Sequence, residues 1–171
     1  IDPQSLIQKV YKLLENNDVP YPTLSEHIGL FPVVFIGPDD TLMITEGSEE
    51  RRKFIDNVIS QTDSIYLDEL INYNRNLMNR NALLRQIAVS GNYDASLMEI
   101  YDDQLVISGN KIFEKRKAFM EEFTAIFNKH YQYLSEDAEQ VELNYDSPLL
   151  QEDFSTILSR NLERDRILER T

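Results

Sequence analysis

Hydrophobic residues from position 47 onward recur at steps of mostly three or four, the spacing that places side chains on one face of an α-helix. The first run opens at Ser48, a good N-cap, followed by Glu49 and Glu50, whose charges suit the positive end of a helix dipole. We therefore predict a helix from about residue 48. Its apolar face would consist of Phe54, Ile55, Val58 and Ile59.

Two longer helices are predicted next. One begins near Asp63 or Ser64, and the other opens near Asp94 after a loop at Ser90-Gly91-Asn92. The second carries an apolar stripe from Leu97 to His130, which corresponds to about 50 to 60 Å of helix at 1.5 Å per residue. This length favours an extended antiparallel helical arm, and a last helix is predicted over residues 149–168.

The N-terminal pattern differs from the rest. Residues 6–14 fit a helical stripe slightly better, but residues 8–15 and 19–21 around a polar turn at 16–18 also fit a β-hairpin. Phe31–Ile36 is β-branched and aromatic, which predicts a buried strand that stops at the turn Gly37–Asp40. Val141–Tyr145 alternates as a strand should. The predicted fold class is mainly α with a small β portion (α+β).

Composition indicates ordinary globular material: 171 residues, 42% hydrophobic and 27% charged. The absence of cysteine excludes disulfides and thiolate metal sites and fits a reducing compartment. No apolar run approaches the roughly 20 residues that span a bilayer, and the N-terminus does not resemble a signal peptide. We expect a cytoplasmic protein with no membrane partner.

Net charge limits a direct role on nucleic acid. Thirty acidic against 17 basic residues give −13, so the chain as a whole should repel a phosphate backbone. Binding to DNA would need a local basic patch, or another part of a longer protein.

Ordered groups of residues along nearly the whole chain resemble the RecF family of bacterial recombination and gap-repair proteins. The most specific signal combines Glu49–Asp56 with Arg80–Leu84 at this spacing. Further matching groups are Leu24–Val34, Ile59–Gln61, Tyr66-Leu67, Tyr73-Asn74, Gln104-Leu105, Gly109, Lys115-Arg116, Phe119, Leu134-Ser135 and Leu143–Tyr145.

The resemblance implies an SMC-like ABC ATPase in which ATP and Mg close a dimer of heads on DNA, beside a projecting helical arm. It implies action at gapped DNA with RecR and RecO to load RecA, and a RecF homodimer as the ATP-bound form. It favours the hairpin over the helix at the N-terminus. It divides the chain into a fringe of the head (1–46), the arm or domain II (47–135), and a return strand and helix toward the head (136–171).

The family's nucleotide motifs do not occur in this sequence. With five glycines in all, it has no GxxxxGK(S/T) phosphate-binding loop, no LSxGQ signature, and no apolar run that ends in acids. We expect a domain excised from a longer protein, without catalytic residues, metal or cofactor of its own, that does not hydrolyse ATP. The alternative is a free-standing helical interaction module, or adaptor, with no nucleotide or DNA role.

Asp39 and Asp40 occupy, by resemblance, the place of the Q-loop that helps to hold magnesium in SMC-like heads. Carboxylates are suitable ligands for this hard cation. The alternative is that these two acids only cap a short helix at Thr41–Ile44.

Basic residues supply the candidate contacts with DNA or with an opposing head. Arg51, Arg52 and Lys53 could pair with phosphate, or with the nearby acids Glu49, Glu50 and Asp56. Arg80, Asn81 and Arg85 could extend a basic strip, or lie on a solvated face. For the remaining groups we expect Lys111, Lys115, Arg116 and Lys117 on the solvent side of their helix, His130 packed on the apolar stripe, and the aromatic residues from Tyr101 to Tyr133 in the core.

Overall fold

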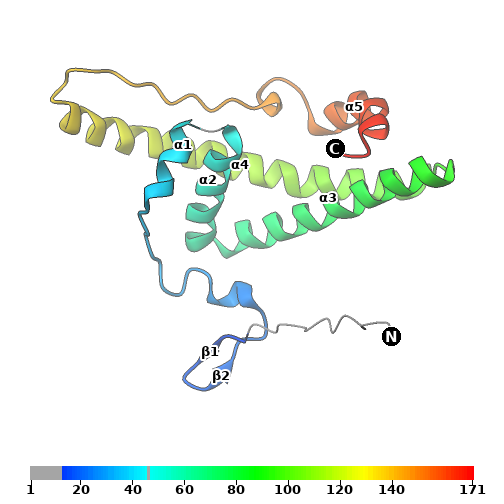
Figure 1. Ribbon diagram of the computed structural model, residues 1–171, viewed down its shortest axis with the longest axis horizontal. Helices are drawn as coiled ribbons and strands as arrows, with labels where there is room; N and C mark the ends of the chain where they lie inside the picture. Colours follow the sequence, from blue (N-terminus) through cyan, green and yellow to red (C-terminus); the bar gives the residue numbers. More distant parts are fainter. Residues whose placement is uncertain (1–12, 46) are drawn as a thin grey trace, which may run out of the picture.

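A long antiparallel pair of helices forms the body of the chain in the computed structural model, which describes residues 13–45 and 47–171. The pair consists of α3 (Ser64–Ser90) and α4 (Ala95–Ser135). The shorter helices α2 (Ser48–Thr62) and α5 (Phe154–Leu168) pack beside it, while the N-terminal segment extends away (Figure 1). The predicted helical arm and α+β class are confirmed.

Side-chain caps explain where the two long helices begin. A carboxylate oxygen of Asp63 accepts the Tyr66 N–H at 3.0 Å, and one of Asp94 accepts the Leu97 N–H at 3.0 Å. Gly91, at φ +71°, ends α3 in the left-handed conformation that glycine adopts without strain. At α2 the predicted cap is wrong by one residue, because Gly47 is the N-cap and Ser48 is the first helical residue.

The core lies between α3 and α4. One cluster near their connection includes Leu83, Leu84, Ile87 and Met98, and another near α2 includes Ile59, Tyr66 and Ile112. The 41 residues of α4 correspond to about 60 Å, so its C-terminal half continues past the start of α3 (Figure 1). Without α3 beside this half, His130 and Tyr133 are exposed, and the expectation that they pack in the core is wrong.

The chain returns from α4 in an extended conformation to the short helix η3 (Pro148–Leu150). The predicted strand Val141–Tyr145 is not formed, because no strand among the described residues pairs with it. The segment is instead attached through side chains, with the ring of Tyr145 stacked 6.1 Å from Phe113 of α4.

The N-terminal segment contains the predicted hairpin. Strands β1 (Glu15–Asn16) and β2 (Val19–Pro20) pair antiparallel across Asn17 and Asp18, both at positive φ, as two-residue hairpin turns require. Most of the competing helical stripe, residues 6–12, lies outside the described residues. After β2 follow η1 (Leu24–His27), η2 (Pro38–Thr41) and α1 (Leu42–Thr45).

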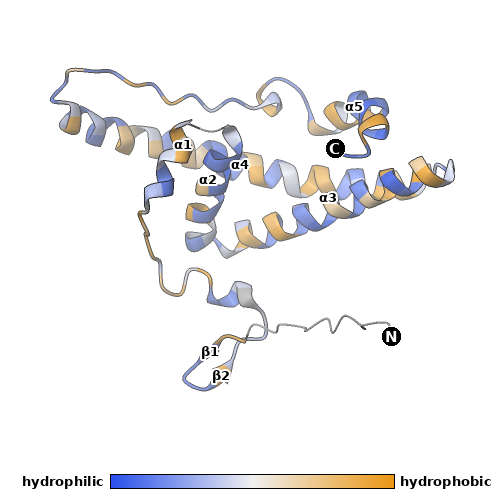
Figure 2. Ribbon diagram, in the orientation of Figure 1, coloured by the Kyte–Doolittle hydropathy of each residue, from blue (hydrophilic) through white to orange (hydrophobic). Residues whose placement is uncertain are grey.

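The predicted buried strand Phe31–Ile36 is wrong for this chain. Val34 and Phe35 are 88% and 86% exposed, and the apolar run crosses open space toward α1 (Figure 2). A buried strand requires neighbouring strands for its backbone and covering layers for its side chains, and the described residues provide neither. Among the described residues, the segment is held to α2 by the Val33 N–H, which donates to Gln61 Oε1 at 2.9 Å.

Candidate functional site

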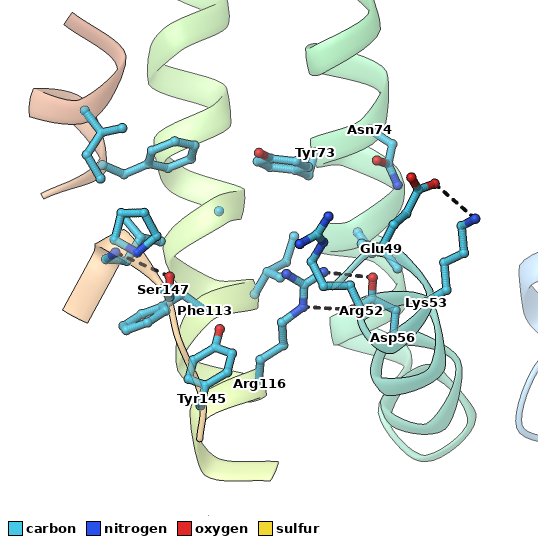
Figure 3. A pocket seen from close by; sticks show the side chains of 17 residues that line it. Glu49, Arg52, Lys53, Asp56, Tyr73, Asn74, Phe113, Arg116, Tyr145 and Ser147 are labelled. Atoms are coloured by element: carbon cyan, nitrogen blue, oxygen red, sulfur yellow. Dashed lines mark hydrogen bonds and ion pairs between the residues drawn. The ribbon is translucent and has the colours of Figure 1, made fainter. Parts of the chain in front are cut away.

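A cavity of about 570 Å³ lies where α2, α3 and α4 meet the segment that leads into α5 (Figure 3). Charged side chains line the side formed by α2, including Arg52, Lys53 and Asp56. Aromatic and aliphatic side chains line the opposite side, including Phe113, Leu149 and Phe154. The cavity is the main concave site that the described residues form around the predicted basic cluster.

Close packing of helices shapes the apolar side. A Cβ placed on Gly109 would lie 2.4 Å from the Phe154 ring and 3.3 Å from Tyr73, so only glycine lets these rings approach α4. The two rings stack on each other at 6.4 Å between centroids. Close packing of the two rings therefore explains why a glycine occurs within this 41-residue helix.

Two carboxylates hold Lys53. Its ammonium lies 3.0 Å from Glu49 and 2.8 Å from Glu50. The hydrogen bond from Lys53 lowers the pKa of Glu49, and the charge of Arg52 adds a smaller lowering. Lys53 thus follows the alternative of an intrahelical ion pair, although it stays largely exposed.

Asp56, one of the acids that could have paired with the basic cluster of α2, pairs instead with Arg116 of α4. Nε and a terminal nitrogen of Arg116 each donate to an Asp56 carboxylate oxygen at 2.8 Å. The Tyr66 hydroxyl also donates to Asp56 and accepts from Arg116 Nε. Burial, followed by the hydrogen bond to Asp56, raises the pKa of Tyr66. We call these three residues the Asp56 cluster; it joins α2, α3 and α4.

The basic run of α4 pairs with neighbouring helices rather than facing only solvent. Lys111 lies 2.6 Å from Glu69, and Lys115 lies 2.6 Å from the helix-capping Asp63. With Arg116, three of the four basic residues that we expected on the solvent side are therefore in ion pairs. Lys111, Lys115 and Lys117 are nevertheless exposed as expected, and only Arg116 is partly buried.

The two remaining candidates on α2 lie at the surface. Arg51 donates to the Met43 carbonyl at 2.9 Å, which joins α1 to α2. Arg52 donates to Ser48 Oγ at 2.7 Å and reaches toward the cavity.

Arg80 is fully buried, so the expectation of a solvated face is wrong for it. It donates to Asp102 of α4 and Asp165 of α5, each at 2.6 Å, and to Thr171 at 2.7 Å. We call these four residues the Arg80 cluster. The partners lie up to 91 positions away along the chain. The spacing of Arg80 could have predicted its burial. It lies seven residues after Tyr73 and four before Leu84, which places it on the apolar stripe of the helix.

Asn81 and Arg85 do not continue the Arg80 cluster into a basic strip. Asn81 Oδ1 accepts the Thr171 backbone N–H at 2.8 Å and so holds the same C-terminal segment. Arg85 is exposed on α3. The three candidates therefore have different surroundings, and only Arg85 presents a charge to solvent.

Asp39 and Asp40 lie in η2, away from the cavity lining. Asp40 Oδ2 accepts the Gly37 N–H at 2.7 Å, as a helix-capping side chain does. Within residues 13–45 and 47–171, no three histidine or acidic side chains are grouped to hold a metal ion. None of the helices in that part of the chain is long and apolar enough to cross a membrane.

Comparison with known proteins identifies relatives over most of the chain, although no family model matches it. The chain is 47% identical over 160 residues to the DNA replication and repair protein RecF of Flavobacterium johnsoniae, covering 94% of this chain and 45% of the relative. It is 45% identical over 157 residues to the protein of the same name from Parabacteroides distasonis.

Solved structures agree with these relatives. One described as the recombination mediator protein RecF-ATPrS in the RecFOR pathway matches with a TM-score of 0.82 and 30% identity over 94% of this chain. A RecF-ATP structure of the same pathway matches with a TM-score of 0.80 and 28% identity. The chain spans less than half the length of the relatives it matches. These matches do not favour the adaptor alternative; over the range it spans, the chain is similar to RecF proteins in both sequence and fold.

Proposed function

We propose that the chain acts within a longer RecF-type protein, an ABC-type ATPase that binds DNA and ATP and functions in replication-gap repair and RecA loading. The observation that carries this proposal is the exposed run Val33–Ile36, every residue of which is at least 66% exposed. A continuous apolar run of this kind marks a surface that another part of a protein covers. Relatives more than twice as long supply the chain that would cover it.

The proposed division assigns residues 1–46 to the fringe of the head, 47–135 to the arm, and 136–171 to the return toward the head. Packing supports the first boundary, because α2 is the first element that joins α3 and α4, whereas the segment before it is largely exposed. In the third part, α5 packs on both α3 and α4. Movement of a head beyond residue 171 would therefore be transmitted to the arm through α5.

In the longer protein, we propose ATP and magnesium as cofactors, with Asp39 and Asp40 in a Q-loop-like position. The description of two similar structures as RecF-ATP and RecF-ATPrS supports nucleotide binding in this family. Gapped DNA, RecR and a second RecF copy are the proposed partners. Asp39→Asn in the longer protein should slow ATP hydrolysis, whereas the same change at Asp18, in the hairpin turn, should not. Equal rates for the two variants would contradict the Q-loop role.

A chimera tests the proposal as a whole. This chain would replace the matching segment of the Flavobacterium johnsoniae relative, to which it is 47% identical. We expect ATP-dependent binding to gapped DNA, measured by fluorescence anisotropy. A folded chimera with no such binding would contradict the proposed function.

The same chimera tests the basic cluster of α2. Arg51→Ala combined with Arg52→Ala should weaken DNA binding and make it less dependent on salt, because fewer counterions are released when phosphate contacts are lost. Arg75→Ala is the control, since this exposed arginine of α3 is not among the candidate contacts. Unchanged affinity and salt dependence in the double variant would reject a DNA-facing role for these arginines.

A further inference from the structure

We propose that the cavity between α2 and the segment before α5 binds a small ligand in which one anionic group is attached to a flat apolar ring. Arg52 would pair with the anion, and the aromatic side would hold the ring. The residues involved all lie between positions 49 and 157, within the packed helical part. The inference therefore does not depend on the proposed role in DNA repair.

Charge is the first argument. Three cationic side chains, Arg52, Lys53 and Arg116, line a cavity that contains two carboxylates, Glu49 and Asp56, in a chain of net charge −13. The carboxylates are engaged, since Glu49 binds Lys53 and both oxygens of Asp56 bind Arg116. Lys53 also binds Glu50 just outside the lining, so Arg52 is the charge among these residues that has no ionic partner in the described part of the chain and would attract an anion.

Arg52 is the cation that remains available. Within the part of the chain that the structure describes, its one hydrogen bond goes to the neutral Ser48 hydroxyl, and it forms no ion pair. A guanidinium carries five N–H donors in a planar fork that suits the paired oxygens of a phosphate or carboxylate. Figure 3 shows Arg52 and Arg116 reaching from α2 and α4 toward the same part of the cavity.

The opposite side is suited to a ring. Tyr73 stacks with Phe154, and Phe113 stacks with Tyr145, so two aromatic pairs line the cavity from α3, α4, the return segment and α5. Aromatic pairs of this kind stabilise a third ring by stacking or edge contacts. Pro148 and Leu149 extend the apolar lining.

The size of the cavity fits such a ligand. Its volume of about 570 Å³ falls within the range of roughly 300–1,000 Å³ typical of small-molecule sites. A site lined by hydrophobic and aromatic side chains, with few polar groups that orient the ligand, is also the usual composition. Inorganic phosphate alone would leave the apolar side unused.

Titration of the 171-residue chain tests this inference, with phenyl phosphate as the first probe and adenosine monophosphate as the second. Inorganic phosphate and benzyl alcohol each provide one half of the proposed ligand. We expect phenyl phosphate to bind at least about tenfold more tightly than either half. It would combine a charge-assisted hydrogen bond to Arg52 with burial of the ring, whereas each half offers only one of these. If adenosine monophosphate binds more tightly than phenyl phosphate, the aromatic side of the cavity prefers a nucleobase to a phenyl ring.

Variants then locate the site. Arg52→Gln should weaken phenyl phosphate binding about tenfold, because it removes the charge but keeps an exposed polar side chain. Arg85→Gln, the same change on an exposed part of α3, should leave the affinity unchanged. Chemical shifts of the Phe113 and Leu149 amides should move on titration. Equal losses in both variants, shifts elsewhere, or no difference between phenyl phosphate and benzyl alcohol would overturn the proposal.

Discussion

Hydrophobic residues form a buried core in the helical part, α2 to α5, but are mostly exposed in the segment from residue 13 to 45. Leu84 and Leu105 of the helical part are at most 1% exposed, whereas Val34 and Phe35 of the N-terminal segment exceed 85%. Hydrophobic residues alone therefore do not determine burial in this chain. What differs is whether the partners that would cover them belong to the same part of the chain.

The difference follows from where each type of structure forms its hydrogen bonds. A helix pairs every interior N–H with a carbonyl four residues earlier, so α3 and α4 need only helices of the same part of the chain, α2 and α5 included, to cover their buried apolar positions. A strand pairs with neighbouring strands, which are absent near Phe31–Ile36 in the described part of the chain. The helical part should thus fold independently, and the N-terminal segment should depend on additional chain.

The largest effect on the helical part is expected from Arg80→Met. The substitution would leave Asp165, itself buried, without its cation, and breaking a buried pair in this way costs about 3–5 kcal/mol of folding stability. Urea denaturation of the chain measures the change. Arg85→Met is the matched control on the same helix, and its effect should stay within about 0.5 kcal/mol. A loss below about 1 kcal/mol for Arg80→Met would show that the Arg80 cluster does not hold α5 on the arm.

A second test concerns the contact between α4 and α5. Gly109→Ala should destabilise the chain by about 1–3 kcal/mol, because the added methyl group overlaps the Phe154 ring. Without that overlap, the same change inside a helix would stabilise by about 1 kcal/mol. Asn110→Ala, at the next and exposed position, is the control and should be neutral or slightly stabilising. A stabilising Gly109→Ala would show that α5 does not pack as described.

The ion pair at the start of α3 should make stability depend on pH. The hydrogen bond from Lys115, followed by that from the Tyr66 N–H, lowers the pKa of Asp63 below its ordinary value of 3.8. A carboxyl whose pKa is lowered on folding stabilises the folded state above that ordinary value. This stabilisation is lost as the pH falls through the lower, folded-state pKa.

Asp63→Asn keeps a good N-cap but removes the charge, so it should cost about 0.5–1 kcal/mol at pH 7 and less at pH 2. Thermal unfolding across this pH range provides the measurement. Asp68→Asn, the same change at an exposed position on α3, is the matched control. A constant difference between the Asp63 variant and the original chain at all pH values would contradict the role of the ion pair.

Sequence reasoning succeeded where information is local. The starts of α3 and α4 follow from the capping residues Asp63 and Asp94. The polar turn at Asn17 and Asp18 was also recognised, although the hydrophobic spacing slightly favoured a helix there and the family resemblance selected the hairpin. These residues act on backbone groups within a few positions, so the printed sequence contains both the cause and its effect.

The candidate site was less accessible from sequence because its contacts are distant. Asp56 pairs with Arg116 across 60 positions, although basic residues lie within one turn of it on α2. For Arg80, both a basic strip and a solvated face were considered, and only its place on an apolar stripe indicated its burial. Which charges meet depends on how helices pack, and spacing within one helix does not determine that.

The smallest effect in this chain is expected where the N-terminal segment is most hydrophobic. Val34→Ser combined with Phe35→Ser should change its free energy of unfolding by no more than about 0.5 kcal/mol, because both side chains already face water. Leu84→Ser, the same type of change in the core, should instead cost several kcal/mol. In a chimera with the longer Flavobacterium johnsoniae relative, the double variant should become strongly destabilising. If it is equally harmless there, the run is not buried in the longer protein, and the main support for placing this chain beside a head would be lost.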